Sequence, residues 1–417
     1  MSRTMRLSFV AGSLVSVLGA FAADPDTQRA YAAELKADAD ARTSQLASEG
    51  LLIAQEGDTS IKLGGWSQFR YLMNWRRDPE NLADGTHQSG FTNGFETART
   101  RLLATGNIMV KDLTFKIEGE FNRNDGQFRM TDAWGKYKFD NGVYTMWGQF
   151  KPPMLREELV SDIYQLAMNR SMMNEIFSLK RSQGVMIGWQ NDSWNIRGSL
   201  NDGGSASNTG FDSPQEADFA ITGRVEYKGA GDWKQLDDFV GWRSQELVWL
   251  IGGALHYQHN GNTNASAPVT QEGEILYTVD ASIEGSGWNA YGAFVGQTTD
   301  SEDDDSLSNF GTVLQGGYMF TDKLDAYLRW DAVISDGDNT NSDNEWYNTV
   351  SIGSNYYCFP RSHAAKFTVE FDWFVEQTDT NGLVNNFANS SSADLVGILP
   401  SNHDDQFALK FQFQLVF

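Results

Sequence analysis

The last eleven residues constrain the fold of this chain more than any other segment. They read FALKFQFQLVF, and from Phe407 to the terminal Phe417 an apolar residue stands at every second position, with only Val416 breaking the polar face between them. Alternation with a period of two predicts a strand that is apolar on one face and solvated on the other. A strand of this kind, ending the chain on an aromatic residue, is typical of a bacterial outer-membrane barrel, whose last strand closes the cylinder and faces lipid.

The N-terminus predicts export. Residues 7–23 form the only long apolar stretch, follow Arg3 and Arg6, and end in Ala-Phe-Ala-Ala. The stretch is short for a membrane anchor and ends in small residues, so we predict a signal peptide over residues 1–23. No later segment qualifies as a transmembrane helix. An exported chain of this kind is either a soluble secreted protein or a β-barrel.

Composition narrows the class further. Cys358 is the only cysteine, so an intrachain disulfide is excluded. Forty glycines and 13% aromatic residues fit an all-β protein with many turns and with aromatic girdles. The net charge of -23 argues against nucleic acid as a partner.

The segment after the signal peptide, residues 24–58, is rich in Ala, Asp and Glu. Tyr31, Leu35, Arg42 and Leu46 recur there at roughly helical spacing, which predicts a short periplasmic helical segment. A trimeric coiled coil and a partly disordered arm are both compatible with this short stripe. We assign residues 59–417 to the barrel.

Alternation predicts sixteen strands in the remaining chain. They span residues 61–75, 95–109, 113–123, 128–139, 143–151, 182–190, 193–201, 217–228, 247–259, 272–284, 287–298, 309–320, 324–334, 346–358, 364–377 and 404–417. The connections alternate between tight turns and long acidic loops, apart from residues 229–246 on the short-turn side. Transmembrane barrels keep short turns in the periplasm, so the sequence predicts a 16-stranded antiparallel transmembrane β-barrel with both termini there.

The interruption at residues 152–181 is the predicted constriction: a third extracellular loop folded into the barrel. Pro152 and Pro153 end the preceding strand. Arg156 and Arg170 are the candidate anion ligands, because a guanidinium group can hold two oxygens of one phosphate. The alternative is that each pairs with a nearby glutamate and pins the loop.

Alternation also predicts which residues line the pore. On the strand 95–109, Thr97 and the two arginines face inward and Ala98 outward. Residues 60–181 hold 17 Lys and Arg against 14 Asp and Glu, whereas residues 182–417 hold 10 against 33. A cationic strip in a water-filled lumen would favour anions, unless its charges pair across the lumen. The candidate pore-lining and anion-binding residues are Arg99, Arg101, Lys116, Lys136, Lys151, Arg156, Arg170 and Arg181.

Several motifs resemble the phosphate-selective porin O and P family of outer-membrane porins. They are FETARTRLLATGNI (95–108), LTFKIEGEFN (113–122), TDAWGKYKF (131–139), WGQFKPPMLREEL (147–159), RSQGVMIGW (181–189), SIGSNYYCFPRSHAAKFTVEF (351–371) and the terminal strand. The resemblance implies a sixteen-stranded, trimeric, passive channel whose loop 152–181 folds inward. The acidic second half of the chain departs from the strongly basic lumen that phosphate selectivity would need.

The sequence therefore predicts a porin for passive diffusion of small hydrophilic solutes, preferring anions such as phosphate. A non-transporting surface barrel (an adhesin or structural anchor) and an unselective or cation-preferring porin remain alternatives. Scattered histidines and the absence of hydrolase motifs argue against an enzyme, and we expect no cofactor or metal. Expected partners are outer-membrane lipids, small anionic or polar solutes, two further copies in a homotrimer, and the barrel assembly machinery, which would recognise Phe417.

Overall fold

The computed structural model describes residues 50–77, 90–214, 216–260, 271–301, 306–337 and 345–417. The predicted signal peptide and most of the predicted arm lie outside these residues. The described strands are β1 (Leu51–Glu56), β2 (Thr59–Trp75), β3 (Phe91–Ile108), β4 (Val110–Phe121), β5 (Phe128–Lys138), β6 (Val143–Phe150), β7 (Ser182–Gln190), β8 (Trp194–Asn201), β9 (Phe219–Ala230), β10 (Val248–His259), β11 (Gln271–Gly285), β12 (Trp288–Ser301), β13 (Leu307–Met319), β14 (Asp325–Ile334), β15 (Trp346–Tyr357), β16 (Ala365–Phe374) and β17 (Gln406–Val416).

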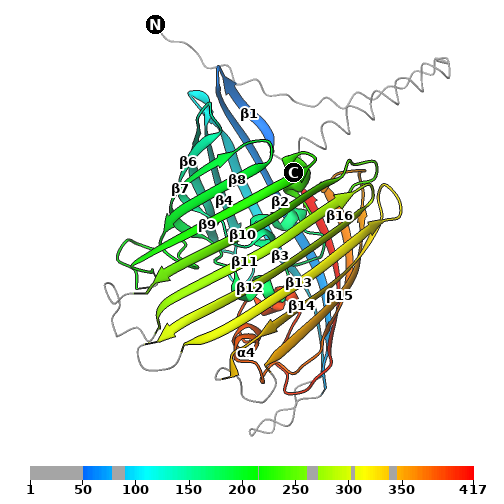
Figure 1. The fold of residues 1–417 in the computed structure, drawn as a ribbon. Helices are drawn as coiled ribbons and strands as arrows, with labels where there is room; N and C mark the ends of the chain where they lie inside the picture. Colours follow the sequence, from blue (N-terminus) through cyan, green and yellow to red (C-terminus); the bar gives the residue numbers. More distant parts are fainter. Residues whose placement is uncertain (1–49, 78–89, 215, 261–270, 302–305, 338–344) are drawn as a thin grey trace, which may run out of the picture. The chain divides into compact units, whose positions relative to one another are not determined.

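Strands β2–β17 form a closed antiparallel barrel, which confirms the predicted sixteen strands (Figure 1). Each strand pairs with its neighbours in the chain. The terminal strand β17 pairs with β2 from Phe407↔Trp75 to Val416↔Trp66 and so closes the cylinder. Because the barrel is closed, each of the sixteen strands pairs with a neighbour on both sides.

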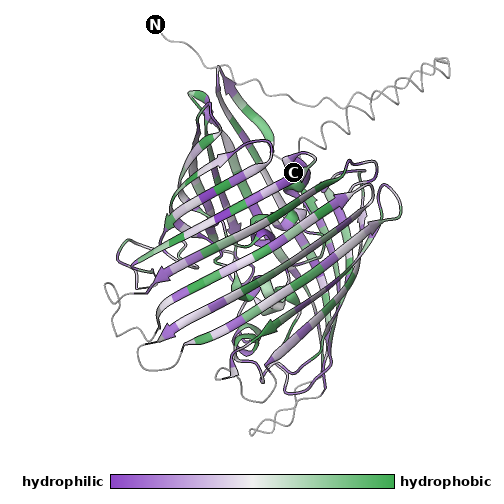
Figure 2. Cartoon of the chain, viewed as in Figure 1, coloured by the Kyte–Doolittle hydropathy of each residue, from purple (hydrophilic) through white to green (hydrophobic). Residues whose placement is uncertain are grey.

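The burial of side chains is inverted relative to a soluble protein. On β16, Lys366, Glu370 and Asp372 are at most 1% exposed, whereas the outward Phe367, Val369, Phe371 and Trp373 are 37–49% exposed. Figure 2 shows the same alternation of hydrophilic and hydrophobic residues along the strands. Charges face the interior and apolar groups face out, the pattern of a barrel whose outer surface contacts lipid.

Strand β1 lies within the segment that the sequence assigned to a helical or flexible arm. Residues 51–56 instead form a hairpin with β2, from Leu51↔Leu63 to Glu56↔Thr59, turning at Gly57 with a positive φ of 61°. The side chains of Leu51, Leu52 and Ile53 are more than half exposed. Leucine and the β-branched Ile53 favour a strand here. The sequence prediction missed this strand because it extended the helical spacing of the preceding residues to residue 58.

One predicted lumen assignment is wrong. Thr97 faces outward with its partner Phe69, while Ala98 is 1% exposed. The reason is a β-bulge: Gln68 pairs with Arg99 and Phe69 with Thr97, so Ala98 has no partner. The extra residue resets the alternation between Glu96 and Arg99, which strict period-two reasoning does not anticipate.

The connections differ at the two ends of the barrel. At one end, called here the short-turn end, they include the turns at residues 109, 286–287 and 320–324, and this end carries Phe417. At the other, the long-loop end, lie α4 (Gly382–Ala388) and α5 (Ala393–Val396) within the connection from β16 to β17. None of the described helices is both long and apolar enough to cross a membrane.

Candidate functional site

The segment between β6 and β7 lies inside the barrel. It carries α2 (Arg156–Leu159), the 3-10 helix η1 (Asp162–Tyr164) and α3 (Met172–Phe177), and most of its residues are buried. Ser171 caps α3 by accepting a hydrogen bond from the Asn174 N–H at 3.1 Å. Glu157 holds the turn before α3 by accepting from the Ser171 N–H at 2.7 Å and from its hydroxyl at 2.6 Å.

Inward side chains of the barrel wall hold the backbone of this segment. Five of its carbonyls accept hydrogen bonds from wall side chains at 2.7–3.2 Å. The pairs are Ile163 with Gln414, Gln165 with Lys366, Leu166 with Asn355, Met168 with Arg70, and Asn169 with Arg329. The donors stand on β17, β16, β15, β2 and β14. The segment is therefore docked against this side of the barrel, since five strands bind consecutive parts of its backbone.

A second segment enters the interior from the short-turn end. Residues 231–247 join β9 to β10 and contain the 3-10 helix η2 (Trp233–Asp237), which Asp232 caps. The N–H of Phe239 donates to the carbonyl of Tyr164 at 3.3 Å, and its ring lies 4.7 Å from that of Tyr291. The long turn that stood out in the sequence thus meets the segment 151–181 inside the barrel.

Part of the interior is an apolar core, which the sequence analysis did not predict. Side chains of both inserted segments, such as Met173, Phe177 and Phe239, pack with inward residues of the wall such as Tyr291 and Val313. Residues of α4 and α5 belong to the same cluster. Burying these side chains stabilises the inserted segments, at about 1.5–3 kcal/mol for each large one.

Three of the predicted anion ligands meet at one carboxylate. Asp162 lies 2.8 Å from Arg101 Nη1 and 3.7 Å from Arg99 Nε, and it also pairs with Arg170 Nη1. Arg101 contacts Glu118 and Glu120 as well, at 3.2 and 2.6 Å. Ion pairs thereby join β3 to the inserted segment, and neighbouring carboxylates neutralise the charge of the arginines.

Three further predicted residues are paired in the same way. Lys116 and Arg181 both contact Asp132 at 2.7 Å. Lys151 lies 3.0 Å from Glu158, which also lies 3.4 Å from Arg170. Burial opposes ionisation of Glu158, but Arg170 and Lys151 hold its pKa well below the usual value. The pairing of Arg170 with Glu158 matches the loop-pinning alternative that the sequence left open.

The remaining two predicted residues differ, because neither forms an ion pair with a carboxylate in the described part of the chain. Lys136 stands 4.0 Å from the centre of the Tyr144 ring. Arg156 donates to Ser282 Oγ and to the carbonyl of Leu236, both at 2.8 Å.

Lys136 belongs to a lysine-rich cavity of about 400 Å³ on the inner wall near the short-turn end. The register places Lys62, Thr105 and Lys116 in one row across β2, β3 and β4. The charged residues in the lining are Lys62, Lys111, Lys116, Lys136, Lys138 and Asp112. Five lysines and one aspartate give this part of the interior a positive potential.

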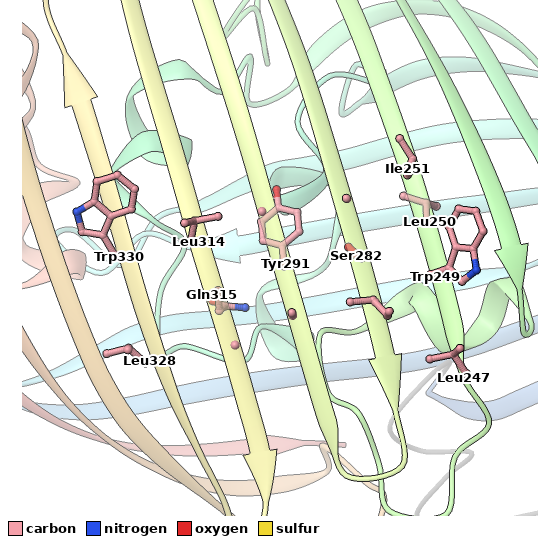
Figure 3. A pocket seen from close by; sticks show the side chains of 15 residues that line it. Leu247, Trp249, Leu250, Ile251, Ser282, Tyr291, Leu314, Gln315, Leu328 and Trp330 are labelled. Carbon is pink, nitrogen blue, oxygen red and sulfur yellow. The ribbon is translucent and has the colours of Figure 1, made fainter.

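A larger cavity of about 1000 Å³ lies on the outer face of β10–β14 and is unrelated to these charges (Figure 3). Small residues form its floor, since Ala281 pairs with Gly292 and Ala290 with Gly316. Trp249 and Trp330 stand at its two sides. Most of its apolar lining, including Ile251, Leu314 and Leu328, is exposed on the outward surface, so it is no part of the interior site.

The sequence prediction missed the donors on the docking wall as site residues, above all Arg70, Arg329 and Lys366. All three are at most 2% exposed, and each holds a carbonyl of the inserted segment. Their inward position was readable from alternation, but their partners were not. No group of His, Cys, Asp or Glu side chains in the described residues has the arrangement of a metal site.

A closed sixteen-stranded barrel with an apolar exterior, charged inner rows and a segment folded between β6 and β7 defines a porin-type outer-membrane channel. The family model for phosphate-selective porin O and P matches residues 69–385, and the chain belongs to that family. Family and fold point to the outer membrane.

Solved structures share the fold at low sequence identity. The anion-selective porin from Comamonas acidovorans has a TM-score of 0.58 and 12% identity, covering 86% of this chain and 100% of that one. The outer membrane channel DcaP of Acinetobacter baumannii has a TM-score of 0.56 and 14% identity, covering 88% and 100%. OmpT of Vibrio cholerae has a TM-score of 0.53 and 10% identity, and the match covers 87% of this chain and 99% of that one. No curated protein matches the chain significantly in sequence.

Proposed function

We propose that this protein is a porin for passive diffusion of small hydrophilic solutes, with a preference for anions such as phosphate. In this proposal the short-turn end faces the periplasm, and residues 151–181 are an extracellular loop that narrows the pore. The chains assemble as homotrimers. Signal-peptide cleavage near residue 23 and recognition of Phe417 by the assembly machinery complete its route to the membrane.

The lysine-rich cavity carries the proposal. The arginines of the Asp162 cluster are largely neutralised by acids, so they contribute little net potential to a passing ion. Lys136 and Lys138 have no acidic partner among the ion pairs of the described residues and line an accessible part of the inner wall. Cations in a narrow, partly water-filled path raise the local concentration of anions.

A planar-bilayer experiment tests this function. In a KCl gradient the reversal potential should have the sign of chloride preference, and Lys136→Gln with Lys138→Gln should reduce it. Arg129→Gln with Arg361→Gln removes the same charge at two exposed sites away from the cavity and should leave it unchanged. Absence of stepwise currents would favour the non-transporting barrel. Cation preference insensitive to the lysine changes would favour the general porin.

A further inference from the structure

A second interior cavity, called here the chamber, lies where the two inserted segments meet the barrel wall. Its volume is about 620 Å³. Arg156, Leu159 and Tyr164 line it from the segment 151–181, Trp233 and Leu236 from the segment 231–247, and Arg197 from β8. The chamber is thus built by both inserted segments and by strands of the barrel wall rather than by a single surface loop.

Arg156 gives the chamber a buried cation that makes no direct ion pair within the described residues. Its side chain is held by Ser282 Oγ, by the carbonyl of Leu236 and by the Phe239 ring, whose centre lies 5.4 Å from the guanidinium carbon. The residue is 6% exposed, and no ion pair joins it to a carboxylate of the described residues. Its three contacts fix the guanidinium without a direct ion pair. Glu226, Asp237 and Glu284 attract it from farther away. An anion in the chamber would therefore make the first direct ion pair with this buried charge.

The wall of the chamber holds further unused polar groups. Arg197 Nη2 lies 2.8 Å from Glu226 Oε2, but Arg197 Nε is buried and makes no hydrogen bond within the described residues. Asn195 Oδ1, on the same strand, is likewise buried without a partner there. Buried polar atoms are rarely left unpaired, so these groups indicate that water or a solute occupies the chamber.

The rest of the lining restricts which anion fits. Leu159, Val160 and Trp233 offer apolar surface beside the guanidinium. Arg156, Arg197 and Lys234 line the chamber together with Glu226 and Asp237, so the lining carries one net positive charge, which balances one negative charge but not two. A hydrated dianion such as hydrogen phosphate would meet both carboxylates and gain nothing from the apolar side. A monoanion with an apolar body uses both kinds of surface.

We propose that the chamber binds small monocarboxylates that carry an aromatic or branched aliphatic group. The carboxylate pairs with Arg156, and the apolar part lies on Leu159 and Trp233. The inference builds on the proposed channel function, because such a channel would retain these monoanions in the chamber while phosphate and other anions pass without binding there. Binding itself is measurable without conduction.

Calorimetric titration of the full barrel in detergent tests the chamber, with benzoate, acetate and inorganic phosphate as probes. Benzoate should bind saturably at one site per chain, at least tenfold more tightly than acetate or phosphate. Arg156→Gln should weaken benzoate at least tenfold, and Trp233→Ala should weaken benzoate but not acetate. Arg129→Gln, an exposed arginine outside the chamber, is the matched control and should bind as the unmodified protein does.

The outcomes separate the chamber from the channel. If Arg156→Gln fails to fold, Arg156→Lys takes its place and should weaken benzoate several-fold, because an ammonium group lacks the paired donors. The proposed binding site is overturned if all three probes bind equally. It is also overturned if the Arg156 and Trp233 changes both leave benzoate binding unaffected. A barrel that binds benzoate but shows no anion preference in the KCl gradient overturns the proposed function and leaves the chamber standing.

Discussion

At the scale of single residues, Asp162 is the group on which the inserted segment most depends. It pairs with Arg99, Arg101 and Arg170, so it joins the wall to the segment and balances three guanidinium groups. Asp162→Asn removes the shared negative charge while keeping the side-chain shape. Removal of one partner from a buried ion pair costs about 3–5 kcal/mol, because the remaining charges stay buried.

We therefore expect Asp162→Asn to lower the thermal unfolding temperature of the barrel in detergent and to increase current noise in bilayers. Asp58→Asn is the control, since Asp58 lies 3.9 Å from Lys111 in an exposed pair. Exposed pairs contribute about 0–1 kcal/mol, so the control should unfold as the unmodified protein does. An unchanged unfolding temperature for Asp162→Asn would mean that the three arginines are balanced without it.

His363 makes stability depend on pH. It lies in the connection between β15 and β16, 4% exposed, with Nε2 3.0 Å from Asp238 Oδ2. Burial lowers its pKa, although the bond to Asp238 opposes the shift. Below the ordinary histidine pKa of about 6.5, the unfolded chain takes up a proton that the folded chain binds less well, so stability falls by up to about 1.4 kcal/mol per pH unit.

The barrel should therefore unfold more readily at pH 5 than at pH 7.5. His363→Gln removes this group, and its loss of stability between the two pH values should be smaller. Thermal unfolding of both proteins in the same detergent measures the difference. His403→Gln, at a site between β16 and β17 away from Asp238, controls for the loss of a histidine. An identical pH dependence in His363→Gln and the unmodified protein would contradict the assignment.

At the scale of elements, the strands were predictable because their signal is local. Strands such as β16 and β17 have an apolar outward face and a polar inward face, so alternation along their sequence is enough to find them. The interior was less predictable, because its contacts join distant residues: Arg101 meets Asp162 only after the segment has folded inward. One interior signal was present but unused, since Tyr291 and Val295 give β12 an apolar inward face that needs a covering segment.

Strand β1 is an element that the barrel should not need. Closure depends on β17 and β2, whose pairing runs over residues 66–75 of β2, whereas β1 pairs with residues 59–63. A chain lacking residues 24–57 should therefore still form a barrel with the heat-dependent electrophoretic shift of a folded porin and with unchanged conductance. Removal of residues 24–50 alone, which keeps β1, is the control. If only the longer deletion prevents folding, β1 is part of the folding unit.

At the scale of the whole molecule, the interior divides into two regions with different roles. Strands β14–β17 and β2 hold the inserted segment through its backbone, and the apolar core fills the space beside them. The lysine-rich cavity and the chamber lie along β2–β5 and β8–β9. In the proposed channel, a solute would pass along the cationic wall, and the acidic second half of the chain would not determine the charge that it meets.

We expect the C-terminus to act in assembly of the barrel. Phe417 is 47% exposed. Its carbonyl accepts a hydrogen bond from the Gly65 N–H at 2.7 Å, and its own N–H donates to the Gly65 carbonyl at 2.8 Å. Deletion of Phe417 removes both bonds at the seam of the barrel and the exposed aromatic end, but none of the interior contacts. We expect much less protein in the outer membrane, while the inserted fraction conducts as the unmodified protein does.

Quantification of outer-membrane protein, together with single-channel conductance, checks this separation. Phe417→Leu keeps the backbone bonds and removes only the aromatic ring, so it distinguishes recognition of the ring from stability of the seam. If recognition dominates, Phe417→Leu should reduce membrane insertion nearly as much as the deletion. Normal insertion of the deletion variant, or an altered conductance in the fraction that inserts, would show that Phe417 acts on the pore rather than on assembly.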